Sequence, residues 1–428
     1  MLALLVVIFV VAYAAIALEH SIGVNKTASA LIAAGSLWTV YAMMGGNHDQ
    51  VSADLTESLA ATAQVVFFLM GAMTIVEVVD AHNGFEVITS RIRTHSQPAL
   101  MSLIGFVTFF LSAVLDNLTT TIVMISLTRK LIDNHEDRLF FAGMIVVAAN
   151  AGGAWSPIGD VTTTMLWIGG QITTLAIMEG VFLAALANLL VPLLVTSYLL
   201  RGRVVVPPPS QELQANHGTT DFEKNLMFGL GIGCLVAVPI FKTVTHLPPF
   251  MGMLFGLGVL WLVGEIIHRG KTDEEKAGLT LVHALMRIDM SSVIFFIGIL
   301  LAVATLEHTH ILSALAGWFG ETIGRLDLIV IVIGLISAIV DNVPLVAASM
   351  GMYSLEQHPQ DSFLWEFLAY CAGTGGSILI IGSAAGVAAM GLEKIHFFWY
   401  ARRIGGLALI GYAAGALVYI LQYRLTHA

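Results

Sequence analysis

Apolar stretches of about 20 residues recur along almost the whole chain, and this feature constrains the fold more than any other. Of the 428 residues, 57% are hydrophobic and 11% are charged, whereas soluble proteins carry about 25% charged residues. So few charges do not cover the surface of a soluble protein of this size, which excludes a cytosolic enzyme, a secreted module and a disordered chain. The sequence therefore predicts an all-α polytopic membrane protein.

Ten stretches are long and apolar enough to be predicted as crossings: residues 2–18, 29–44, 58–79, 139–169, 180–200, 225–242, 250–268, 285–306, 363–394 and 404–423. No basic run precedes the first stretch, so we expect a retained span there rather than a signal peptide. If the N-terminus lies outside, most Lys and Arg residues fall in loops on one side, and only Lys242, Arg325 and Arg424 fall on the other. The basic side is predicted to be cytoplasmic.

Two further apolar stretches, 98–130 and 326–355, are each interrupted by an Asp-Asn pair. After the pair Asp116-Asn117, only about eleven residues precede Arg129, and a helix of that length rises about 16 Å, half the hydrocarbon thickness. The second stretch repeats this pattern at Asp341-Asn342. We therefore expect two re-entrant hairpins whose tips lie near mid-membrane, where irregular backbone must be covered by protein or line a wet cavity.

The two halves of the chain resemble each other. Residues 111–117 read LSAVLDN and residues 336–342 read ISAIVDN, while ANAGGA at 149–154 matches AGTGGS at 372–377 with nearly the same offset. Several matches in one order indicate duplication. Five crossings in each half would invert the second half, an arrangement typical of secondary transporters. The predicted units are a first repeat, 1–200, with hairpin 98–130 and broken helix 139–169; a cytoplasmic linker, 201–224; and a second repeat, 225–428, with hairpin 326–355 and broken helix 363–394.

Polar residues at the tips and helix breaks are the candidate site. A carboxylate deep in the bilayer costs about 2.5–3.5 kcal/mol and is functional by default, and hard cations prefer oxygen ligands. The structural alternative for Asp116 and Asp341 is capping of the second arm. The candidate cation ligands are Ser112, Asp116, Asn117, Thr119, Thr120, Asn150, Gly152 and Asp160 in the first half, and Ser337, Asp341, Asn342, Thr374 and Ser377 in the second.

Several of these residues have an equally reasonable structural role. Ser112 and Ser337 precede an Asp by one helical turn and either share its site or bond back to their own helix. Asp160 is either a ligand or a helix cap. The acidic residues Glu77 and Asp80, near His82, either line a proton entry path or form a solvated helix end, and the second interpretation is favoured.

Three segments resemble the NhaD-type sodium/proton antiporters of the ion transporter superfamily: SAVLDNLTTT at 112–121, NAGGAWSPIGDVTTTM at 150–165 and SAIVDNVPL at 337–345. The resemblance extends over GAMTIVEVVDAH at 71–82 and covers most of the chain. It implies two scaffold helix sets, two transport regions that each combine a hairpin with a broken helix, and efflux of Na⁺ or Li⁺ driven by proton entry. Related dicarboxylate transporters carry Ser-Asn-Thr at their hairpin tips. In this chain Asp stands in place of the Ser at both tips, which argues against a dicarboxylate substrate.

The residues themselves also favour a cation. No Lys or Arg lies in either tip or break, so a dianionic substrate would lack a partner, whereas a deep carboxylate holds either a proton or Na⁺. We therefore expect a Na⁺/H⁺ antiporter for pH homeostasis, with an anion carrier for dicarboxylate or arsenite-like substrates as the alternative. An enzyme is not expected, nor is a cofactor or a nucleic-acid partner. The expected location is the lipid bilayer of the bacterial inner membrane, and a homodimer is compatible with the sequence.

Overall fold

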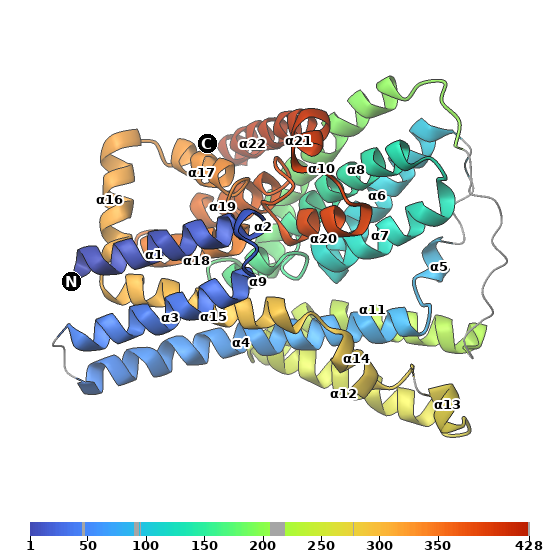
Figure 1. Ribbon diagram of the computed structural model, residues 1–428, viewed down its shortest axis with the longest axis horizontal. Coiled ribbons are helices and arrows are strands. Elements are labelled where there is room, and N and C mark those ends of the chain that lie inside the picture. Colours follow the sequence, from blue (N-terminus) through green and yellow to red (C-terminus); the bar gives the residue numbers. More distant parts are fainter. Residues whose placement is uncertain (45–47, 90–93, 95, 206–218, 277, 427–428) are drawn as a thin grey trace.

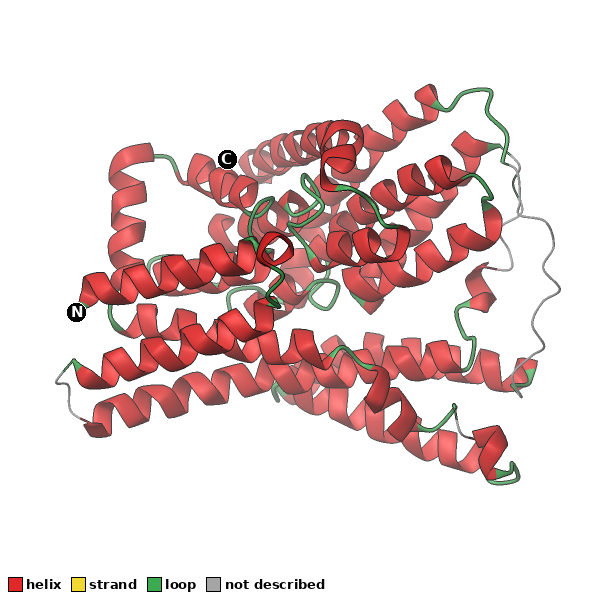
Figure 2. Ribbon diagram, in the orientation of Figure 1, coloured by secondary structure: helices red, strands yellow, loops and turns green. Residues whose placement is uncertain are grey.

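The computed structural model describes the chain except for residues 45–47, 90–93, 95, 206–218, 277 and 427–428. In the described residues the regular secondary structure is helical, apart from one isolated bridge between Ser96 and Val204 (Figures 1 and 2). In the first half the helices are α1 Leu2–Ala17, α2 Glu19–Ile22, α3 Lys26–Met43, α4 His48–Ala81, α5 Glu86–Thr89, α6 Gln97–Leu115, α7 Asn117–Leu131, α8 His135–Ala154, α9 Val161–Ile168 and α10 Thr174–Leu199.

The second half begins after the linker. Its helices are α11 Asp221–Thr245, α12 Pro249–Ile267, α13 Asp273–Lys276, α14 Leu281–Arg287, α15 Met290–His308, α16 Ile311–Ile323, α17 Leu326–Ile336, α18 Asn342–Met352, α19 Phe363–Gly375, α20 Ala384–Glu393, α21 Phe397–Tyr400 and α22 Gly406–Thr426, with a π-helical turn, Ala401–Gly405, between the last two.

Length and composition identify membrane-spanning helices. Among the described residues, seven helices are long and apolar enough to cross a bilayer, namely α4, α6, α10, α11, α12, α15 and the continuous helix Phe397–Thr426. Large apolar side chains on these helices stay exposed, with Leu194 at 69%, Phe255 at 68% and Val244 at 73%. Lipid tails solvate such side chains as well as a protein core does. The chain is therefore an integral, multi-pass membrane protein.

Two helices are interrupted at the predicted breaks. The predicted crossing 139–169 consists of α8 and α9, which are separated by residues 155–160, and the crossing 363–394 consists of α19 and α20, separated by residues 376–383. Pro157 lies in the first interruption, where it lacks the N–H that a continuous helix requires. Each break therefore places a helix C-terminus opposite a helix N-terminus in the interior.

The Asp-Asn pairs mark sharp reversals between helices. Helix α6 ends at Leu115 and α7 begins at Asn117, so only Asp116 separates them, while residues 337–341 separate α17 from α18. Helices α6 and α7 pack against each other. With 19 residues, α6 is itself long and apolar enough to cross a bilayer, whereas α7 has only 15 residues.

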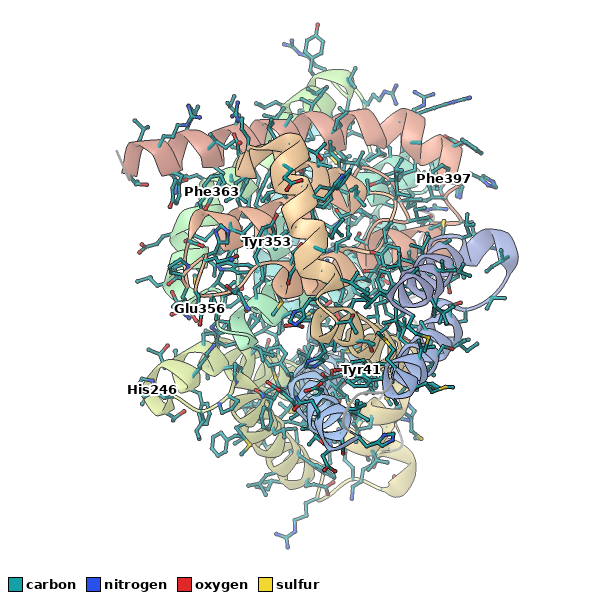
Figure 3. All side chains as sticks on the ribbon, turned by 90° about the vertical axis from the view of Figure 1, so that its left-hand side faces the viewer. Tyr41, His246, Tyr353, Glu356, Phe363 and Phe397 are labelled. Carbon is teal, nitrogen blue, oxygen red and sulfur yellow. The ribbon has the colours of Figure 1, made fainter. Side chains whose placement is uncertain are left out.

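Two further elements differ from the sequence prediction. The predicted crossing 285–306 is divided into α14 and α15, with Ile288 and Asp289 between them. Helix α16 was not predicted, because its 13 residues are too short to span a bilayer. Figure 1 shows α16 at one end of the molecule, roughly perpendicular to the long helices, and Figure 3 shows that end with Tyr353 near its middle.

The core is formed by α8 and α19. All residues of α19 from Leu364 to Gly375 are buried, as are those of α8 from Phe141 to Ala154. Helices α6, α7, α10 and α20 pack around α8. Helix α4 packs instead against α11, α12 and α15, and Figure 1 shows this second group along the opposite side of the molecule. The first helix break lies between the two groups, as α9 contacts both α4 and α19.

Candidate functional site

Asp116 caps α7 and forms the turn of the first hairpin. Its Oδ1 accepts a hydrogen bond from the backbone N–H of Thr119 at 2.8 Å, and its Oδ2 accepts one from the Thr119 hydroxyl at 2.9 Å. Its backbone has φ of 95°, a conformation that costs a residue with a side chain about 1–3 kcal/mol. The structural alternative predicted for Asp116, capping of the second arm, is therefore observed, and Asn117 is the first residue of the helix.

Asp341 lies between α17 and α18 as Asp116 lies between α6 and α7, but it has a different partner. Its Oδ1 accepts a hydrogen bond from the backbone N–H of Val343 at 3.2 Å, so Asp341, and not Asn342, caps α18. Its Oδ2 lies 2.8 Å from the ammonium of Lys26, at the start of α3. Lys26 was missed in the sequence, although it is the only Lys or Arg among residues 1–90.

Asp160 is the centre of a buried polar network. It is 2% exposed and caps α9 by accepting from the backbone N–H of Thr162 at 3.1 Å. Its Oδ2 accepts hydrogen bonds from the side-chain amides of Asn117, at 2.8 Å, and Asn342, at 3.3 Å. The two predicted roles of Asp160 therefore coexist, because capping uses one oxygen and the two tip amides use the other.

Asn150 extends this network to the second helix break. Its Oδ1 accepts a hydrogen bond from Asn117 at 2.9 Å, and its amide donates to the hydroxyls of Ser377 and Ser383, each at 2.9 Å. All four side chains are buried. The predicted ligands from hairpin tips and helix breaks are thus brought together across both halves of the chain.

The two predicted serines bond to backbone carbonyl groups. Ser112 donates to the carbonyl of Ala149 at 2.6 Å, and Ser337 donates to those of Ala372 at 3.0 Å and Gly334 at 2.7 Å. Each serine thereby fastens the first arm of a hairpin to the adjacent broken helix. Neither hydroxyl donates to the aspartate one turn later.

Two glycines allow this close approach. A Cβ atom added to Gly152 would collide with the backbone carbonyl of Phe109, and one added to Gly375 would collide with that of Gly334. Gly152 therefore serves close packing in this structure. The neighbouring atom belongs to the backbone and not to a flexible side chain. The collision could therefore be removed only by shifting a helix, which is energetically costly.

The remaining predicted ligands divide between the site and its surroundings. The hydroxyl of Thr119 binds Asp116, and that of Thr374 donates to the carbonyl of Tyr370 at 2.6 Å, within its own helix. Among the described residues, the hydroxyl of Thr120 is buried and has no hydrogen-bond partner. Buried polar atoms are normally paired, so this hydroxyl is an unused oxygen atom on the first turn of the helix that Asp116 caps.

A small cavity of about 50 Å³ lies between these carboxylates, and Asp116, Asn117, Asp160 and Thr164 contribute to its lining. Its other walls are mainly apolar and come from α4, α12 and α15. Within the described residues, no Lys or Arg forms an ion pair with Asp116 or Asp160. The cavity thus offers oxygen atoms and negative charge without a resident cation.

Two larger cavities lie toward opposite ends of α4. One, of about 240 Å³, is lined by Glu77, Asp80 and Glu86 and shares Leu118 with the small cavity. The other, of about 300 Å³, is lined by Glu57, Glu307 and His308. Glu77 pairs with Arg287 at 2.8 Å, so it is not simply a solvated helix end. Both cavities are lined by carboxylates, which attract cations.

The sequence of the chain matches a known protein family. The profile of the citrate-transporter family (CitMHS) matches residues 2–373. The chain is 50% identical to "Sodium/proton antiporter 1" of Arabidopsis thaliana, over 98% of this chain and 72% of that protein. It is 30% identical to "Na(+)/H(+) antiporter NhaD" of Vibrio cholerae, over 97% of this chain and 90% of that protein. The chain therefore belongs to the CitMHS family and, within it, to the NhaD-type sodium/proton antiporters.

Proposed function

We propose that this protein exchanges intracellular Na⁺, and also Li⁺, for external H⁺ across the membrane. The observation that carries the proposal is the small cavity lined by Asp116 and Asp160, which has oxygen ligands and lacks an ion-pairing base among the described residues. A carboxylate there binds either a proton or a metal cation, and the competition between the two is the chemical basis of antiport. The names of the relatives from Arabidopsis thaliana and Vibrio cholerae support Na⁺ and H⁺ as the exchanged ions.

Alternating access is the proposed transport cycle. We infer that each half contains a re-entrant hairpin and a broken helix and that the second half is inverted relative to the first. The paired contacts Ser112 to Ala149 and Ser337 to Ala372, at matching places in the two halves, support this symmetry. The two acid-lined cavities at opposite ends of α4 are the proposed entrances.

An anion carrier is the weaker alternative, although the family profile carries the name of citrate. A citrate-like substrate needs cationic groups, but the ammonium of Lys26, which contacts the second Asp-Asn pair, is already paired with Asp341. The carboxylates of Asp116 and Asp160 would repel a carboxylate substrate. The proposed location is an energised membrane such as the bacterial inner membrane.

The test is cation-induced proton movement in everted membrane vesicles, scanned over Na⁺, Li⁺ and K⁺. Addition of Na⁺ to vesicles with the wild-type protein should dissipate an imposed pH gradient, and Asp116→Asn, which keeps the size of the side chain but removes its charge, should abolish the response. Near-normal exchange by Asp116→Asn would contradict the assignment of Asp116. Citrate uptake without any Na⁺ response would instead support the anion carrier.

A further inference from the structure

The two hairpin tips are alike in sequence but differ in charge. Both Asp116 and Asp341 use Oδ1 to cap the following helix. The Oδ2 of Asp116 meets a neutral hydroxyl, whereas the Oδ2 of Asp341 meets the ammonium of Lys26. An ammonium ion 2.8 Å from a carboxylate neutralises it. Only the first tip therefore presents an uncompensated negative charge.

The sequence explains why the second tip recruits a distant cation. Aligning Asp116-Asn117 with Asp341-Asn342 places Pro344 where the first half has Thr119. Proline has neither a hydroxyl nor a backbone N–H, so it supplies neither of the hydrogen bonds that Thr119 makes to Asp116. The Oδ2 of Asp341 is thus left available, and Lys26 fills the position.

Lys26 is held in place by its own surroundings. Asn25 caps α3 by accepting from the backbone N–H of Thr27 at 2.8 Å, which fixes Lys26 as the first residue of the helix. Its ammonium also lies 4.5 Å from the centre of the Phe295 ring on α15. A cation in the first turn is opposed by the helix dipole, so its placement there depends on these partners and on Asp341.

The pair is also shielded from solvent. The side chain of Lys26 is 19% exposed and that of Asp341 is 11% exposed. Removing one partner of such a pair leaves the other charge buried and uncompensated, which is more costly than removing both. The pair therefore behaves as one unit in any substitution experiment.

We propose that Lys26 is a tethered cation that takes the place of a second Na⁺ at Asp341. This inference rests on the proposed function and specifies its stoichiometry, because it leaves the cavity of Asp116 and Asp160 as the one Na⁺ site of each chain. Lys26 thus determines how many ions bind, although it belongs to α3 and lies outside both hairpins and both helix breaks.

The test is equilibrium binding of ²²Na⁺ to the purified protein. The wild type should bind one Na⁺ per chain. Lys26→Gln, which keeps most of the side-chain length but removes the charge, should bind two. Lys26→Arg keeps the charge and should still bind one. The double variant Lys26→Gln/Asp341→Asn should return to one, because the released carboxylate is then absent.

The outcomes separate this inference from the proposed function. A wild type that binds two Na⁺, or a folded Lys26→Gln variant that binds one, would overturn the tethered cation while leaving Na⁺ exchange intact. A wild type that binds no Na⁺ would overturn the proposed function, and this inference with it. If Lys26→Gln fails to fold, Asp341→Asn is the deciding variant. It should still bind one Na⁺ per chain, although the unpaired Lys26 is expected to slow transport. Loss of all Na⁺ binding in Asp341→Asn would contradict the inference.

Discussion

The side-chain amide of Asn342 donates a hydrogen bond to the carboxylate of Asp160 at 3.3 Å, although the two residues are 182 positions apart in the chain. Asn117 donates to the same oxygen at 2.8 Å. The tips of both hairpins therefore converge on one buried carboxylate that belongs to the first helix break. This arrangement makes Asp160, rather than either tip alone, the structural centre of the candidate site.

Asp160→Asn should therefore eliminate Na⁺-dependent exchange. The substitution conserves volume, but it removes the charge and places an amide N–H₂ or a neutral oxygen opposite the amide donors of Asn117 and Asn342. A buried donor without an acceptor costs about 1–3 kcal/mol, so thermal stability should also decrease. Exchange in vesicles and the melting temperature of the purified protein measure the two effects.

The matched control is Asp327→Asn, which removes an aspartate paired with the exposed Arg325 at the start of α17. A surface ion pair contributes about 0–1 kcal/mol, so exchange and stability should stay close to those of the wild type. Wild-type exchange by Asp160→Asn would contradict a role for this carboxylate in cation binding.

The local features of the site could be read from the sequence, whereas its long-range contacts could not. Pro157 lies in the first helix break and the Asp-Asn pairs lie at the reversals, because these residues act on the backbone beside them. The contact between Lys26 and Asp341 joins positions 315 residues apart. Nothing in the local pattern of either segment specifies this contact, since it depends on how the two halves pack.

Helix α16 shows a different limit of sequence interpretation. The search for spans counts apolar residues over about 20 positions, and α16 is too short to register. Of its residues, Leu312 alone is buried, whereas Phe319 and Ile323 are partly buried against the core and Trp318 is exposed. Such a helix can be predicted from its amphipathic pattern, if short helices are considered as well as membrane spans.

Gly152→Ala and Gly375→Ala should each destabilise the protein strongly. In both, the new methyl group meets a backbone carbonyl of the adjacent hairpin arm, that of Phe109 or that of Gly334. Overpacking of this kind costs about 1–3 kcal/mol or more, which exceeds the gain of about 1 kcal/mol from replacing a helical glycine. Thermal unfolding of the purified variants measures the balance.

Gly35→Ala is the control for the glycine pair. Gly35 lies within α3, and a Cβ atom added there meets nothing within 4 Å. The helix should gain about 0.5–1 kcal/mol, and the melting temperature should stay constant or rise. Equal melting temperatures for Gly35→Ala and Gly152→Ala would show that the close approach of α6 and α8 is absent.

The hairpin of α6 and α7 should return to the side of the membrane from which it enters. In a background with Cys234→Ala and Cys371→Ala, single cysteines at Ser96 and Asp133 should both react with an impermeant maleimide from the cytoplasm. A cysteine at the exposed His246, between α11 and α12, should react only from the opposite side. Reaction of positions 96 and 133 from different sides would mean that this segment crosses the membrane an odd number of times.

Acid should weaken the contact between α4 and α12 through two histidines just beyond their ends. The rings of His82 and His268 are stacked with centres 5.1 Å apart, and their Nε2 atoms are 3.2 Å apart. Nδ1 of His82 lies 2.7 Å from the carbonyl of Val78, which fixes the proton on Nδ1. Nε2 of neutral His82 therefore accepts a hydrogen bond from His268, and both rings are neutral in this arrangement.

Burial lowers the pKa of His82, and burial together with the neighbouring His82 lowers the pKa of His268 from 6.5 to about 4. The pair of Glu223 and Lys271, 2.8 Å apart, also acts on both rings. Below pH 6.5 the unfolded chain binds a proton that the folded protein does not, so stability is full above that pH and falls toward pH 4.

The expected loss is on the order of 2 kcal/mol between pH 7 and pH 4. Melting temperatures of the wild type and His268→Gln over this range test it, and the variant should show a smaller pH dependence. His135→Gln, at an exposed position in the first turn of α8, serves as the control and should retain the wild-type slope. An identical slope in all three proteins would exclude the histidine pair as the source.

The apparent affinity for Na⁺ should rise with pH, because a proton on Asp116 or Asp160 removes the charge that binds Na⁺. With one competing proton, the apparent dissociation constant should fall by at most about tenfold per pH unit and become constant once the carboxylates are ionised. Activity should increase from neutral to alkaline pH and then decline as protons for the return step become scarce.

Since Lys26 already neutralises Asp341, Asp341→Asn should lower the rate and leave this pH dependence of affinity unchanged. Titrations of Na⁺ at several pH values, with the wild type beside Asp341→Asn, measure both quantities. An affinity that does not vary with pH in the wild type would exclude direct competition between H⁺ and Na⁺, and a changed slope in Asp341→Asn would assign that carboxylate to proton exchange.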